Sequence, residues 1–128
     1  MNTQINKPVR EDKQRLQDRV DSIAKGLSSS FSENGKGEQW DKNSYPVEDG
    51  QEEMSAMDWL QDCLDFNYIL NADQTFKSAR VLVAFGGPNI WVDFQTKEVE
   101  GFWWGSYAKA SFDDVNNIEE ALEELYGN

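Results

Sequence analysis

The sequence contains no histidine and only one cysteine, Cys63. The absence of histidine removes the commonest general base, the commonest transition-metal ligand and the base of a Ser-His or Cys-His nucleophile. A single cysteine cannot form an internal disulfide, and without histidine it cannot form a structural zinc site. We therefore expect no metal, no cofactor and no enzymatic activity, and a reducing compartment such as the cytoplasm.

Long apolar runs are also missing. No segment approaches the ~20 apolar residues that a membrane-spanning helix requires, and the N-terminus lacks the apolar core of a secretory signal. The length of 128 residues allows one small domain and a tail. These features predict a cytoplasmic protein that has no membrane partner.

Basic residues are scarce outside the N-terminal segment. Residues 1–28 contain six bases and four acids, whereas residues 29–128 contain six bases and twenty acids, a net charge of −14. Such a negative surface repels nucleic acid and anionic membranes, and it attracts the basic grooves of proteins at long range. The charge favours a protein partner over direct binding to nucleic acid.

An amphipathic helix is predicted over residues 10–27, within an N-terminal unit of residues 1–30. Its apolar residues recur at spacings of 4, 3 and 4, which places them on one helix face. They are Leu16, Val20, Ile23 and Leu27. This stripe could dock on the chain's own domain or form the self-association seam of a homodimer, and contact with a partner is a less favoured third use. Residues 31–53 are polar and predict a flexible linker, in which Trp40 and Tyr45 could anchor the chain.

The compact domain is predicted over residues 54–128. Ser55 with Asp58 resembles a capping box, and it begins a helix that should run to about Asn67. Three β-rich segments follow, separated by turn formers, and they indicate a three-stranded antiparallel meander. These strands are expected at residues 79–85, 90–94 and 99–104.

A last helix is predicted from a second capping box, Ser111 with Asp114. Its apolar stripe should dock on the sheet. The stripe is Val115, Ile118, Leu122 and Leu125. The predicted fold class is therefore α+β, with helices packed on one face of the meander and preceded by the N-terminal helix and polar linker.

The predicted last helix is rich in carboxylates. They are Asp113, Asp114, Glu119, Glu120, Glu123 and Glu124. Acids at the C-terminal end of a helix oppose its dipole by about 0.3–1 kcal/mol each, and glutamates four residues apart repel one another. We expect no nearby Lys or Arg to relieve this charge. A negative surface shaped for a basic partner is one interpretation, and a solvated face kept for solubility is the other.

Trp103 and Trp104 are neighbours on the third predicted strand, so their side chains should point to opposite faces. We expect helices to cover one of them and the other to lie near the surface, where Trp is a typical hot-spot residue of protein interfaces. Stacking on nucleic-acid bases would need a basic surround, and only Lys97 and Lys109 are close in the sequence. A protein-facing patch is favoured.

Two further patterns are less specific. Gly86-Gly87-Pro88-Asn89 could present backbone amides to an anion, but no P-loop signature follows it, and a hairpin turn is favoured. Asp93 and Glu100 could face each other across a hairpin, as the paired acids of glycosidases do. No cleft or substrate supports that pairing, so an enzyme is the least favoured class.

The runs GGPNIWVD (86–93) and GFWWG (101–105) resemble small proteins of bacteriophages and mobile elements that carry a GGPN-x-W-x-D hairpin followed by a WWG strand. The resemblance covers roughly residues 80–126 and carries no catalytic residues with it. In size and acidity the chain is also similar, as a class, to anti-CRISPR and antirestriction proteins. That similarity implies a phage-borne inhibitor in the host cytoplasm, which occupies a nucleic-acid-binding surface of a host defence complex.

The leading hypothesis is a non-enzymatic acidic inhibitor that acts as a nucleic-acid mimic. Its carboxylates would replace phosphates in the basic groove of a host nucleic-acid-handling protein, and Trp103 or Trp104 would add apolar contact. An immunity protein or antitoxin that neutralises a basic nuclease would use the same electrostatics. A dimeric structural or regulatory protein, joined through the N-terminal stripe, is a further alternative.

Overall fold

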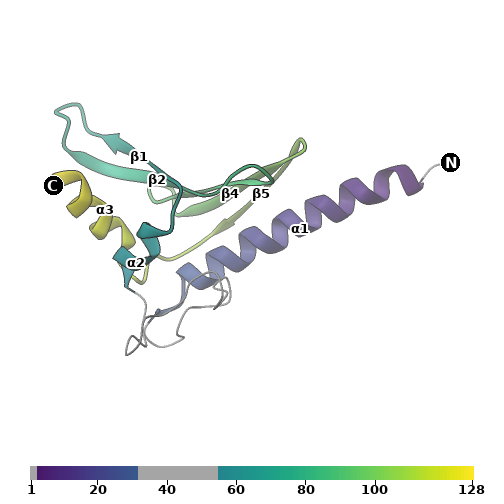
Figure 1. Cartoon of the computed structure of the whole chain (residues 1–128), viewed down its shortest axis with the longest axis horizontal. Coiled ribbons are helices and arrows are strands. Elements are labelled where there is room, and N and C mark those ends of the chain that lie inside the picture. Colours follow the sequence, from purple (N-terminus) through teal and green to yellow (C-terminus); the bar gives the residue numbers. More distant parts are fainter. Residues whose placement is uncertain (1–2, 32–54) are drawn as a thin grey trace.

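A computed structural model describes residues 3–31 and 55–128 of the chain, with side chains from residue 11 (Figure 1). In chain order the elements are α1 (Thr3–Leu27), α2 (Ala56–Gln61), β1 (Asp65–Leu70), β2 (Phe76–Ala84), β3 (Asn89–Asp93), β4 (Glu98–Trp103), β5 (Ser106–Ser111) and α3 (Ile118–Gly127). The α+β class is confirmed. The predicted linker lies outside the described residues, Trp40 and Tyr45 included, apart from Phe31, which is buried.

The sheet is an antiparallel meander, but it contains five strands in the described part of the chain rather than the three predicted. Its order is β1-β2-β3-β4-β5. One row across β2, β3, β4 and β5 is apolar and consists of Val81, Val92, Val99 and Ala110. The neighbouring row points to the other face and consists of Leu82, Trp91, Glu100 and Lys109. Figure 1 shows the three helices on the same side of the sheet. Among the described elements, no helix covers the opposite side, which we call the open face.

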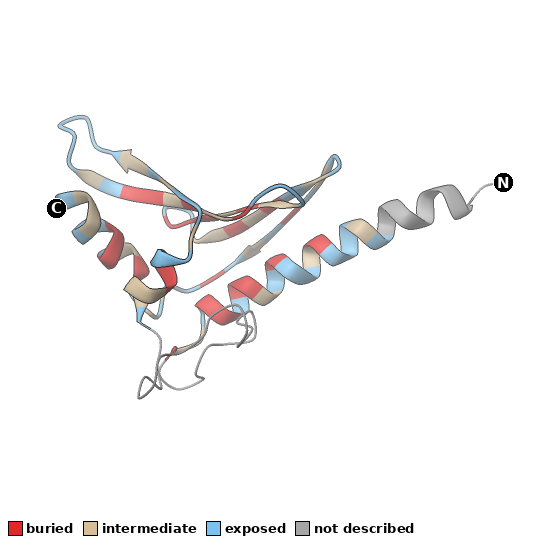
Figure 2. Cartoon of the chain, viewed as in Figure 1, coloured by how far each residue is buried: buried red, intermediate tan, exposed pale blue. Residues whose placement is uncertain are grey.

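Helix α1 crosses β4 and β5 and covers their apolar side. The predicted stripe is buried there: Leu16, Val20, Ile23 and Leu27. Figure 2 shows these buried positions along the part of α1 that lies against the sheet. The stripe therefore belongs to the hydrophobic core of the chain itself. Docking on the chain's own domain is the use that the structure shows, and these four side chains do not form an exposed homodimer seam.

The helix predicted from Ser55 to about Asn67 is too long. Its start is confirmed, because Ser55 Oγ accepts a hydrogen bond from the Asp58 amide at 3.1 Å and the Ser55 amide donates to the Asp58 carboxylate at 3.0 Å. However, α2 ends at Gln61, and the chain continues as β1 from Asp65. Antiparallel pairing with β2 overrides the helical spacing of the apolar residues in this segment.

The second capping box is also wrong in detail. Ser111 is the last residue of β5, which completes a hairpin with β4, and α3 begins only at Ile118. Asp114 nevertheless caps this helix, because its two carboxylate oxygens accept hydrogen bonds from the amides of Ile118 and Glu119, both at 2.9 Å. Val115 lies before the helix and is exposed.

Candidate functional site

Two of the six carboxylates predicted to bind a partner stabilise the fold instead. Asp114 caps α3. Glu119 accepts a hydrogen bond from Ser78 Oγ at 2.6 Å and forms an ion pair with Lys97 Nζ at 3.2 Å. The expectation that no base lies near these acids is therefore wrong for Glu119, because the turn between β3 and β4 brings Lys97 to α3.

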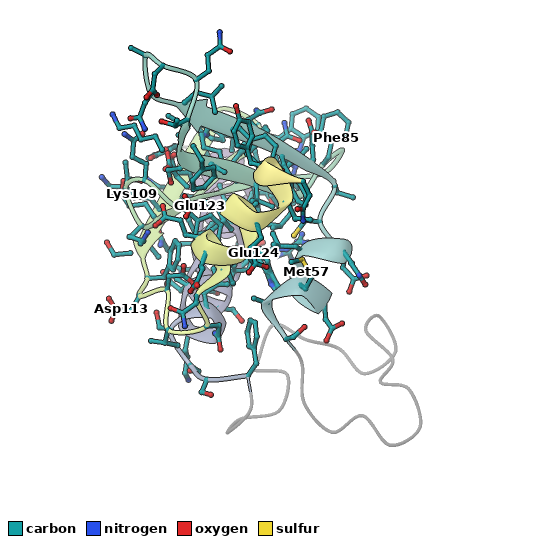
Figure 3. All side chains as sticks on the ribbon, turned by 90° about the vertical axis from the view of Figure 1, so that its left-hand side faces the viewer. Met57, Phe85, Lys109, Asp113, Glu123 and Glu124 are labelled. Carbon is teal, nitrogen blue, oxygen red and sulfur yellow. The ribbon has the colours of Figure 1, made fainter. Side chains whose placement is uncertain are left out.

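The other four predicted carboxylates are exposed. They are Asp113, Glu120, Glu123 and Glu124. In the described residues, no ion pair neutralises them. Figure 3 shows Glu123 and Glu124 on α3, and Asp113 on the chain that leads into this helix. We call these four residues the acidic surface.

Trp103 and Trp104 differ in exposure as predicted, but strand alternation is not the reason, because β4 ends at Trp103 and Trp104 lies in the turn that follows. Trp103 is half-buried and packs against the hydrophobic core, whereas 83% of Trp104 is exposed. Trp104 and Gly105 form the turn between β4 and β5, with φ angles of 51° and 79°. Positive φ at both central positions is typical of a type I′ turn, which prefers Asn, Asp or Gly. Trp104 thus combines an unfavourable backbone conformation with little burial.

The structure places Trp104 far from the acidic surface. In a meander, successive turns lie at opposite ends of the sheet. Helix α3 lies at the end with the β1–β2 and β3–β4 turns, where Tyr126 Oη donates to the Gln74 carbonyl at 2.7 Å and Lys97 contacts Glu119. Trp104 lies at the other end, as Figure 1 shows for the β4–β5 turn. The predicted partner-binding residues therefore form two surfaces rather than one.

Three other aromatic side chains accompany Trp104 at its end of the sheet. Phe85 is 73% exposed and lies in the β2–β3 connection, while Phe102 and Tyr107 are 40% and 43% exposed. The last two are paired across β4 and β5 with ring centroids 5.1 Å apart. We call Phe85, Phe102, Trp104 and Tyr107 the aromatic end. Sequence reasoning missed it as a group, although the alternation of strand residues placed aromatic side chains on both faces of the sheet.

A charged network on the open face adjoins the aromatic end. The Arg80 guanidinium lies over the Trp91 ring, 4.8 Å from its centroid, and is 3.6 Å from an Asp93 oxygen and 3.7 Å from a Glu100 oxygen. Tyr107 Oη donates a hydrogen bond to Glu100 at 2.7 Å, and this bond is the main cause that raises the pKa of Tyr107 to about 12.

The carboxylates considered as a glycosidase-like pair belong to this network. The register places Trp91, not Asp93, opposite Glu100. Asp93 also accepts hydrogen bonds from the amides of Gln95 and Thr96 at 2.9 and 3.1 Å. Arg80 and the β3–β4 turn therefore give both carboxylates structural partners.

Comparisons with protein-family models, with curated proteins and with solved structures found no match to this chain. In the described residues, no cluster of His, Cys, Asp and Glu could hold a metal ion. No described helix is both long enough and apolar enough to cross a bilayer. The two surfaces therefore have to be interpreted from their own geometry.

A pocket of about 290 Å³ lies beside β1 and is lined by Cys63, Leu64, Asp65, Phe66 and Tyr68. Burial is the main cause that raises the pKa of the Cys63 thiol, and the nearby Asp62 carboxylate raises it further. Cys63 Sγ also donates to the Trp59 carbonyl at 3.3 Å. Because the thiolate is the nucleophilic form, this cysteine is inert at neutral pH.

Proposed function

We propose that the protein is a non-enzymatic inhibitor whose acidic surface binds a basic groove of a nucleic-acid-handling protein. A host defence complex is the partner class that the resemblance to anti-CRISPR and antirestriction proteins implies. The observation that carries the proposal is the exposure of Glu120, Glu123 and Glu124 without a neutralising cation in the described residues. All three are exposed on a helix whose dipole disfavours the last two, and no cation pairs with them among the described residues.

The charge balance of the domain supports this proposal. Residues 55–128 contain thirteen acids and only four bases. Three of these bases form ion pairs with carboxylates elsewhere: Arg80, Lys97 and Lys109. The fourth base, Lys77, forms no ion pair with the acidic surface in the described residues, so the domain's own cations leave that surface negative.

The spacing on α3 gives a row of negative charge. Glu120 and Glu124 are one helical turn apart, about 5.4 Å along the axis, and Glu123 lies within the same turn. Lys and Arg side chains that bind phosphates form charge-assisted hydrogen bonds with carboxylates in the same way. Binding should weaken as salt concentration rises, because the ions screen both partners.

The decisive experiment removes the charge without changing side-chain shape. A triple variant, Glu120→Gln, Glu123→Gln and Glu124→Gln, should lose capture of its partner from host lysate at about 0.1 M salt while circular dichroism shows an intact fold. Glu119 is left unchanged because it holds α3 to the sheet.

A matched control removes three charges from α1: Glu11→Gln, Asp12→Asn and Asp18→Asn. It should bind as the unmodified protein does, because these positions are away from α3. Full binding by the α3 variant would contradict the proposal. The identity of the captured protein separates the alternatives, since a basic nuclease toxin would make this chain an immunity protein or antitoxin.

A further inference from the structure

The aromatic end has no role in the proposal above. We propose that it is a second docking site, which binds an arginine-bearing segment of the partner protein. This inference rests on the proposed function only in taking the partner to be a basic protein, and its test is separate.

Trp104 is the central residue of this site. Its φ of 51° is in the left-handed region, which is unfavourable for a bulky side chain. Asn or Gly would suit the type I′ turn better, and with 83% of Trp104 exposed its side chain contributes little to the core. Neither turn formation nor packing against the described residues, 11–31 and 55–128, explains a tryptophan here. An interface does, because exposed Trp residues are frequent hot spots.

Three other exposed aromatic side chains lie at the same end of the sheet as Trp104. Phe102 and Tyr107 flank the β4–β5 turn on the open face, and their rings contact each other. Phe85 lies at the same end of the sheet, since the β2–β3 and β4–β5 turns of a meander share one end. The site therefore presents aromatic ring faces, which carry partial negative charge, to solvent.

The charges around these rings favour a cation. Glu100 lies on the open face and accepts the hydrogen bond of Tyr107 Oη at 2.7 Å, and residues 55–128 as a whole hold thirteen acids against four bases. Arg80 is 3.7 Å from Glu100 and 3.6 Å from Asp93, so two carboxylates share this one base and the network keeps a net negative charge. Aromatic faces beside carboxylates attract a guanidinium. A nucleic-acid strand would instead need Lys or Arg side chains that are free of ion pairs to hold its phosphates.

The structure already contains one guanidinium held in this way. Arg80 stacks over Trp91 at 4.8 Å with Asp93 and Glu100 beside it. An arginine of the partner would stack on Trp104 or on the Phe102–Tyr107 pair with the same chemistry. Arginine is favoured over lysine because its planar group stacks on rings and hydrogen-bonds carboxylates in the same plane.

The test is a titration of the full-length, isotope-labelled protein with a synthetic peptide of alternating arginine and glycine, in about 0.3 M salt to screen long-range attraction. The titration is followed by NMR. The proposal predicts chemical-shift changes for the Trp104 indole N–H and for the backbone amides of residues 98–109. Trp104→Asn, which keeps the turn, should weaken binding by about 2- to 30-fold. An equally charged lysine–glycine peptide should bind more weakly than the arginine peptide.

Two control variants make the result specific. Leu64→Ala removes another exposed apolar side chain, outside the aromatic end, and should leave peptide binding unchanged. The triple Gln variant of α3 should retain the Trp104 shifts. The inference would be overturned if partner capture depended on α3 but the arginine peptide caused no chemical-shift change at Trp104. That result would leave the proposed function intact.

Other occupants give distinct results, and each would overturn the proposal. If a peptide with uncharged citrulline in place of arginine bound equally tightly, the positive charge would not contribute to binding. Tighter binding of a single-stranded oligothymidine at Trp104 would indicate a nucleic-acid site. A doubled mass in solution that Trp104→Asn abolishes would indicate that a second copy of the chain covers the surface.

Discussion

Val20 of α1 lies directly over Gly101 of β4. A Cβ atom placed on Gly101 would be 2.8 Å from Val20 Cγ2 and also 2.8 Å from Leu16 Cδ1, closer than real Cβ contacts. Glycine weakens the interior of a strand, but it allows another element to approach the backbone closely. The close packing of α1 on the sheet therefore depends on the absence of a side chain at position 101.

Gly101→Ala should lower the free energy of unfolding by about 1–3 kcal/mol, because the added methyl group overpacks the contact with α1. Denaturant unfolding followed by circular dichroism measures the loss. Gly87→Ala is the matched control, since a Cβ there would meet no atom within 4 Å. Equal losses in both variants would mean that the Gly101 contact is not specific.

Glu119 and Glu120 are neighbours on α3 that should respond differently to loss of charge. Glu119→Gln weakens the contacts with Ser78 and Lys97, and the partial exposure of the pair limits the cost to about 1 kcal/mol. Glu120→Gln should change stability by less than about 0.5 kcal/mol. Urea unfolding measures the free energy of unfolding of each single variant. A larger loss of stability for Glu120→Gln than for Glu119→Gln would contradict the assignment of Glu119 to the fold and of Glu120 to the acidic surface.

Trp104→Asn should stabilise the protein by about 1 kcal/mol, because Asn tolerates the left-handed conformation that Trp104 adopts. Thermal unfolding would then show a higher midpoint, although the same variant loses binding of the arginine peptide. A lower midpoint would show that the Trp104 side chain contributes to the fold, and it would contradict the role of Trp104 as an interface residue.

Glu100→Gln should bring the pKa of Tyr107 down from about 12 toward its ordinary value near 10, because the hydrogen bond to a carboxylate favours the protonated phenol. The raised folded-state pKa means that this bond stabilises the fold fully below about pH 10. Its contribution is lost as pH rises through about 12. An NMR titration of the tyrosine ring signals measures the shift, and an unchanged Tyr107 pKa would exclude Glu100 as its cause.

Local patterns in the sequence predicted several features correctly. The stripe of α1, the start of α2 and the Gly86–Asn89 hairpin turn were predicted from neighbours within a few residues. The different exposures of Trp103 and Trp104 were predicted for the wrong reason, since Trp104 lies in the β4–β5 turn and not on the predicted strand. Strands β1 and β5 were missed because short apolar segments fit helix and strand patterns alike, and only their pairing with β2 and β4 distinguishes them.

By itself, the sequence determined the net charge of −12, the lack of histidine chemistry and the amphipathic helix, since these depend on composition or on near neighbours. The tertiary structure decided that Lys97 neutralises Glu119, that Gly101 admits α1, and that Trp104 lies apart from the acidic surface. Each of these results concerns residues that are distant in the sequence. Strand register and helix docking decide whether such residues come into contact, and local sequence patterns do not contain that information.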